Sequence, residues 1–174
     1  MTGQLALLRG INVGGHKKVP MARLRELFAE LGYRGARTFI QSGNVVFDSD
    51  DDPQALRTAI EAGIERAFGF AVPVLVRDRA RLDAVLAGNP FAGRDLDPSK
   101  LTVAFASVPP SGATAPAGHP EEVAVAAGEL FIYYPDGMGK SKLDQSVFFK
   151  GRGDVTITTR NWRTVTKLRA MMDG

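Results

Sequence analysis

The sequence contains no cysteine, which excludes disulfide bonds, thiolate metal sites and a cysteine nucleophile. Only two of its 174 residues are histidine, so the set of side chains suited to metal binding or acid–base chemistry is small. The acidic run at residues 48–52 lacks the glycine and the distal glutamate of a calcium loop. We therefore expect no metal and no cofactor.

Long hydrophobic runs are also missing. No apolar run approaches the roughly 20 residues that a membrane span needs, and residues 2–4 lead directly into an expected strand without an export pattern. Together with the absence of cysteine, this favours a cytoplasmic protein that does not bind a membrane.

The composition is that of an ordinary globular protein with an uneven charge distribution. Hydrophobic residues make up 44% of the chain, enough for one compact domain of two lobes. Residues 1–37 hold seven Lys/Arg against two Glu, a balance of +5, and residues 138–172 hold eight Lys/Arg against two Asp, a balance of +6. If these ends meet, they form one cationic face; the alternative is scattered, solvated charge.

The first half of the chain predicts a ferredoxin-like βαββαβ subdomain over residues 1–77. Apolar and β-branched runs predict strands at 4–9, 36–41, 44–48 and 72–77, with the middle pair joined as a hairpin around Ser42 and Gly43. One helix is expected to follow Pro20 and to end at Gly32. A second begins with Asp52 as its cap and Pro53 at its first position, and ends at Gly69.

The second half predicts a smaller α+β subdomain over residues 78–174, packed against the first. We expect a helix at 79–87, strands at 101–106, 123–126 and 130–134, and a final helix capped by Thr159. Prolines and glycines over residues 109–120 predict an irregular loop. The class expected for the whole chain is α+β.

A glycine-rich, cationic turn at residues 9–18 is the first candidate site. Glycine lets the backbone approach a ligand, and the helix that follows offers unpaired N–H groups to an anion. His16 is the candidate acid or base, although no nucleophile or carboxylate accompanies it in the sequence. The candidate ligand-binding residues of this turn are Arg9, Asn12, Gly14, Gly15 and Lys18.

Three further segments supply candidate ligand-binding residues. Ser42 and Asn44 are either hairpin residues or hydrogen-bonding groups for a ligand. The string at 137–141 lacks the first glycine of a phosphate-binding loop, yet Lys140 and Lys142 could still bind an anion. Arg160 and Asn161, expected in the first turn of the final helix, are either oxyanion ligands or structural residues.

The chain resembles the bacterial family catalogued as domain of unknown function 1697. The resemblance rests on four strings: LLRGINVGG at 7–15, QSGNVVF at 41–47, YPDGMGKSKL at 134–143 and TRNW at 159–162. It implies an α+β fold of two subdomains with a ferredoxin-like part. It implies no activity, substrate or catalytic residue.

Three classes of function remain open from the sequence. The first is a binding protein or enzyme for a phosphorylated or nucleotide-like small molecule, held in a cationic cleft built from both basic ends. The second is RNA or other nucleic-acid binding, favoured by the sequence pI of about 9.4 and the ferredoxin-like order, but lacking the aromatic motif of RNA-recognition domains. The third is a scaffold or oligomerisation module with no ligand.

Overall fold

A computed structural model describes residues 2–174, and its contacts divide the chain into two compact units. The first comprises the chain up to Leu82 together with Leu168–Gly174, and the second comprises Asp83–Lys167. The sequence-based division into 1–77 and 78–174 differs from this at the C-terminus. The last residues belong with the first unit because the guanidinium of Arg37 donates to the carbonyl of Met171 and Arg79 pairs with Asp173.

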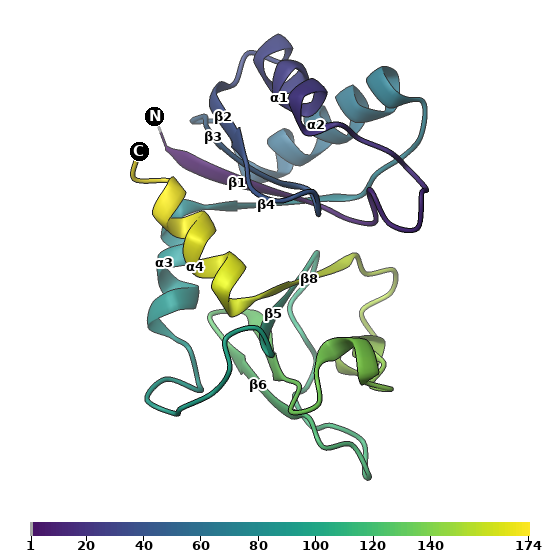
Figure 1. Cartoon of the computed structure of the whole chain (residues 1–174), viewed down its shortest axis with the longest axis vertical. Helices are drawn as coiled ribbons and strands as arrows, with labels where there is room; N and C mark the ends of the chain where they lie inside the picture. The colour runs from purple at the N-terminus through teal and green to yellow at the C-terminus, as the bar shows by residue number, and fades with distance from the viewer. Residues whose placement is uncertain (1) are drawn as a thin grey trace. The chain divides into compact units, whose positions relative to one another are not determined.

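The first unit contains a four-stranded antiparallel sheet in the order β2-β3-β1-β4 (Figure 1). Its strands are β1 (Gly3–Leu8), β2 (Arg34–Thr38), β3 (Asn44–Asp48) and β4 (Val74–Asp78). With one helix between β1 and β2 and another between β3 and β4, the order is βαββαβ. The predicted ferredoxin-like arrangement is confirmed.

The two helices of this unit begin where the sequence predicts. Helix α1 (Met21–Glu30) starts after Pro20, and α2 (Pro53–Phe68) starts after Asp52, whose carboxylate accepts the backbone N–H groups of Gln54 and Ala55. Gly69 ends α2 in the left-handed conformation. The predicted cap, first-position proline and terminal glycine of α2 are therefore all confirmed.

Both helices cover one face of the sheet, as Figure 1 shows, and the core of the unit lies between them. Alternate strand residues point to this face because successive side chains in a strand alternate in direction. Those of β1, β3 and β4 meet the apolar faces of both helices, and the fully or nearly fully buried members are Ala6, Leu8, Val45, Phe47, Val74, Val76, Leu24, Leu27, Phe28, Leu56, Ile60 and Ile64.

The second unit contains another four-stranded antiparallel sheet, in the order β6-β7-β5-β8. Its strands are β5 (Leu101–Ala106), β6 (Glu122–Ala126), β7 (Glu129–Tyr133) and β8 (Ile157–Asn161). The short 3-10 helix η2 (Gln145–Phe149) packs Phe148 and Phe149 against one face of this sheet, and η1 (Met138–Lys140) precedes it. The predicted α+β class is confirmed for the chain as a whole.

The start of the final helix was predicted incorrectly. Residues 157–161 form β8 along β5, and α4 (Trp162–Met171) begins only after them. The cap is Asn161, whose side-chain oxygen accepts the N–H of Thr164, and not Thr159. Helix α3 (Arg79–Ala87) lies where the sequence predicts, and residues 109–120 form a loop without helix or strand, also as predicted.

Candidate functional site

The turn after β1 is a compact structure held by its own backbone. Asn12 and Lys17 have φ angles of 54° and 48°, and the N–H of Asn12 donates to the carbonyl of Lys17 over 3.1 Å. Val13 and His16 form an isolated antiparallel bridge inside the turn. Positive φ is rare for residues other than glycine, so this turn holds backbone conformations that must be stabilised by contacts around it.

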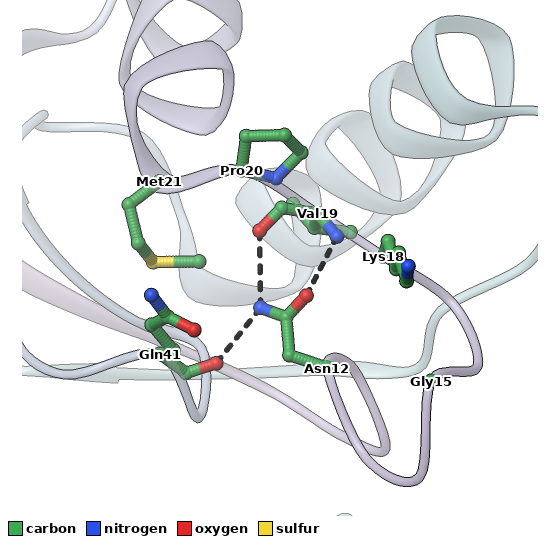
Figure 2. Close-up of a pocket in the computed structure, with 7 residues that line it drawn as sticks. All are labelled: Asn12, Gly15, Lys18, Val19, Pro20, Met21 and Gln41. Carbon is green, nitrogen blue, oxygen red and sulfur yellow. Dashed lines mark hydrogen bonds between the residues drawn. The ribbon is translucent and has the colours of Figure 1, made fainter.

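The side chain of Asn12 provides those contacts (Figure 2). Its amide nitrogen donates to the carbonyls of Val19, over 3.0 Å, and Gln41, over 2.9 Å. Its oxygen accepts the N–H of Val19 over 2.8 Å. Asn12 thus joins the turn after β1 to the start of α1 and to the turn between β2 and β3. Both polar atoms of its side chain form hydrogen bonds with backbone groups.

The turn between β2 and β3 is organised by Asn44, which is fully buried. Its amide nitrogen donates to the carbonyl of Phe39 and to the hydroxyl of Ser42, each over 3.0 Å. Ile40 in this turn has a φ of 51° although it is β-branched and half exposed. Ser42 and Asn44 therefore maintain the shape of the turn that places Gln41 against Asn12.

A cavity of about 320 Å³ lies where these two turns meet the start of α1 (Figure 2). Its volume is at the lower end of the range for small-molecule sites. Three of the predicted residues, Asn12, Gly15 and Lys18, line this cavity together. The other lining residues, which the sequence analysis missed, are Val19, Pro20, Met21 and Gln41.

The N-terminus of α1 adjoins the cavity through Pro20 and Met21. No side chain in the described part of the chain caps this helix end, and its first turn contains no acidic residue. The first N–H groups of a helix have no partner within the helix and carry partial positive charge. In α2 of the same unit the side chain of Asp52 accepts two of these groups, whereas α1 has no side-chain cap and its first residue, Met21, lines the cavity.

None of the three cations of the turn, Arg9, Lys17 and Lys18, pairs with a carboxylate among residues 2–174. Arg9 and Lys18 are exposed, and neither side chain forms an ion pair or hydrogen bond with any residue from 2 to 174. Lys17 differs because its ammonium donates to the carbonyl of Ala71 over 2.8 Å. His16 is exposed and no carboxylate orients its ring in the described chain, so the geometry assigns it no acid–base partner.

Four of the predicted ligand-binding residues lie in the second unit: Lys140, Lys142, Arg160 and Asn161. Lys140 and Lys142 are exposed on either side of Ser141, whose hydroxyl donates to the carboxylate of Glu121. Gly14 lies in the first unit, exposed beside Gly15, and does not line the cavity. That the two basic ends form a single cleft stays a prediction.

Arg160 and Asn161 occupy structural positions at the end of β8. Arg160 is 8% exposed, and its guanidinium donates to the hydroxyl of Thr158 and to the carbonyl of Thr159. Burial lowers the pKa of Arg160 to about 10, so the side chain still carries its charge at neutral pH. Asn161 caps α4, which favours the structural interpretation of this residue.

Within residues 2–174, no three or more His, Cys, Asp or Glu side chains gather in a way that could hold a metal ion. Over the same residues, no helix combines the length and the apolar character needed to cross a membrane.

A family model matches the chain, and a solved structure is similar to it over nearly its whole length. The sequence model for the family described as "Protein of unknown function (DUF1697)" matches residues 1–131. The solved structure of the conserved bacterial protein SP0830 from Streptococcus pneumoniae is similar over 98% of both chains, with a TM-score of 0.73 and 25% sequence identity. No curated protein matches the chain.

Proposed function

The chain belongs to the DUF1697 family of proteins of unknown function, and we propose that it binds a small phosphorylated or otherwise anionic molecule in the cavity at the start of α1. Because the family description names no ligand, the proposal rests on the residues of the chain itself. The observation that carries this proposal is the coincidence of three features at one cavity: Lys18 with no partner among residues 2–174, the uncapped helix end and the backbone of Gly15.

Each feature favours negative charge on a ligand. Lys18 supplies a full positive charge that no carboxylate in the described chain neutralises. The free N–H groups at the start of α1 add hydrogen-bond donors and the positive end of the helix dipole. An anion that reaches all three would gain charge-assisted hydrogen bonds, which are about twice as strong as neutral ones.

The size of the cavity favours a small molecule over a polymer. A space of about 320 Å³ accommodates a ligand of mononucleotide or sugar-phosphate size. RNA binding in the manner of RNA-recognition domains would require aromatic rings on the open face of the sheet. Phe47 of β3 is 1% exposed and packs against Phe28 and Tyr33 in the core instead.

The proposal concerns binding. Catalysis by this site would depend on electrostatic stabilisation of charge by Lys18 and the helix end, because His16 has no orienting partner among residues 2–174.

Thermal unfolding in the presence of candidate ligands tests this function. We expect inorganic phosphate, pyrophosphate, sugar phosphates or mononucleotides to raise the Tm, because a ligand that binds only the folded state stabilises it. We expect Lys18→Gln to weaken the affinity for the stabilising ligand by roughly tenfold or more, the effect of losing one charge-assisted hydrogen bond.

The matched control is Lys167→Gln, which removes one positive charge from the exposed face of α4 in the second unit. If both variants weaken binding equally, only the overall charge matters and the cavity is not the site. If no small anion raises the Tm but short RNA does, with an affinity that falls steeply as salt increases, the protein binds nucleic acid instead.

A further inference from the structure

A buried carboxylate lies at the end of the loop 109–120 in the second unit. Glu121 is 8% exposed, and one of its oxygens, Oε1, accepts the hydroxyl hydrogen of Ser141. Its second oxygen, Oε2, is also buried and accepts no hydrogen bond from the described residues. Leaving a buried charged oxygen without a partner is costly, so a positively charged species is expected beside Oε2.

The group closest to that requirement is the ring of His119. Its Nδ1 lies 3.6 Å from Oε2 of Glu121, which is beyond hydrogen-bond distance, and its side chain is 25% exposed. A ring nitrogen and a carboxylate oxygen that both bind a tetrahedral ion at about 2.1 Å lie roughly 3.4 Å apart. The observed separation is close to this value.

We propose that His119 and Glu121 form a binding site for a divalent transition-metal ion of the zinc type. The two residues supply one imidazole nitrogen and one carboxylate oxygen. This combination suits Zn²⁺, Co²⁺ or Ni²⁺, whereas Mg²⁺ and Ca²⁺ prefer sets of oxygen ligands. The proposal is independent of the anion cavity, which lies in the first unit.

The surroundings of Glu121 resemble those of a metal-binding carboxylate. Such ligands are themselves held by hydrogen bonds from neighbouring groups, which orient the free oxygen. Ser141 does this for Glu121, and Ser141 is in turn fixed because its own oxygen accepts the N–H of Leu143 over 3.0 Å. The other oxygen, Oε2, lies toward Nδ1 of His119.

Two protein ligands leave positions on the ion for water or for another molecule. No third His, Cys, Asp or Glu joins the pair within the described chain. Closed structural zinc sites have four protein ligands and catalytic sites three, so this site is expected to be open and to bind more weakly than either.

Calorimetric titration of the metal-free full chain with Zn²⁺ tests the site. We expect one ion per chain, with the affinity lowered at least tenfold by His119→Ala. The matched control is His16→Ala, which removes the other of the two histidines and is expected to leave binding unchanged. Glu121→Gln, which keeps an acceptor for Ser141 but removes the charge, is also expected to weaken binding, and circular dichroism checks that it folds.

Three results would overturn the proposal. One is the absence of Zn²⁺ binding at Zn²⁺ concentrations up to about 100 μM, which is well above the dissociation constants usual for protein zinc sites. Another is equal loss of binding in the two histidine variants. The third is that His119→Ala lowers the Tm of the metal-free protein while Zn²⁺ has no effect, which would identify the pair as a salt bridge between a protonated His119 and Glu121.

Discussion

Replacing Gly43 by alanine is expected to lower the free energy of unfolding by about 3 kcal/mol, measured by urea denaturation. Gly43 has a φ of 92°, a conformation that costs residues with a Cβ roughly 1–2 kcal/mol. A Cβ at this position would also lie 2.7 Å from the Cβ of Leu8 and 3.0 Å from the Cδ1 of Ile11. Overpacking of this kind costs about 1–3 kcal/mol more.

Leu8 cannot relieve this contact by rotating its side chain. The atom concerned is its Cβ, which is fixed by the backbone of β1, and Leu8 is fully buried. The N–H of Leu8 also donates to the carbonyl of Gly43 over 2.8 Å, so the two backbones are held together. A shift of the turn between β2 and β3 would therefore have to break that hydrogen bond.

Gly69→Ala is the matched control for Gly43→Ala. Gly69 has a similar φ of 79°, but apart from its chain neighbours no atom of residues 2–174 lies within 4 Å of a Cβ placed there. We expect it to cost only the conformational part, about 1 kcal/mol. Equal losses for the two variants would contradict the close approach of the turn to β1.

Asn12→Ala is expected to lower the free energy of unfolding by about 2–4 kcal/mol and to abolish anion binding. It removes three hydrogen bonds to Val19 and Gln41, each contributing roughly 1 kcal/mol. It also places alanine at a φ of 54°, which asparagine tolerates better. Binding is expected to fail because the residues that line the cavity lose the side chain that positions them.

Asn12→Gly separates the two effects of this substitution. Glycine adopts the positive φ without strain but restores none of the hydrogen bonds. We expect it to recover part of the stability lost by alanine, measured by urea denaturation, and none of the anion binding. Wild-type affinity in Asn12→Gly would show that the bridge from Asn12 does not shape the site.

The fold of the first unit was predictable because its signals are local. The apolar residues of α2 recur at helical spacing, and Asp52, Pro53 and Gly69 mark its ends by their own conformational preferences. Each of these features can be recognised from residues within one helix. The βαββαβ order followed from the succession of such elements.

The error at β8 arose because a polar strand resembles a helix start. Ile157–Asn161 contains β-branched residues, which favour a strand, but also Thr159 and Asn161, which are typical helix caps. The strand exists because β5 pairs with it, with Thr102 opposite Asn161 and Ala106 opposite Ile157. A pairing across such a distance in sequence leaves no local signal.

The sequence indicated where the candidate site lies, but not which contacts shape it or which apolar residues line it. Glycines and lysines identified the turn at residues 9–18, and Asn12, Gly15 and Lys18 do line one cavity. The sequence did not indicate that Asn12 acts through backbone groups, because one of its partners, Gln41, lies 29 positions away. Val19, Pro20 and Met21 were missed because apolar residues carry no chemical signal of a site.

The central claim, a small-anion site at the start of α1, is tested most directly by amide chemical-shift mapping with the ligand that gives the largest rise in Tm. We expect the backbone N–H signals of Gly15 and Lys18 and those of the first turn of α1, Met21 to Arg23, to shift with one common affinity. Lys18→Gln should reduce these shifts at equal ligand concentration. Saturable shifts confined to other residues, or no saturable shift at all, would contradict the claim.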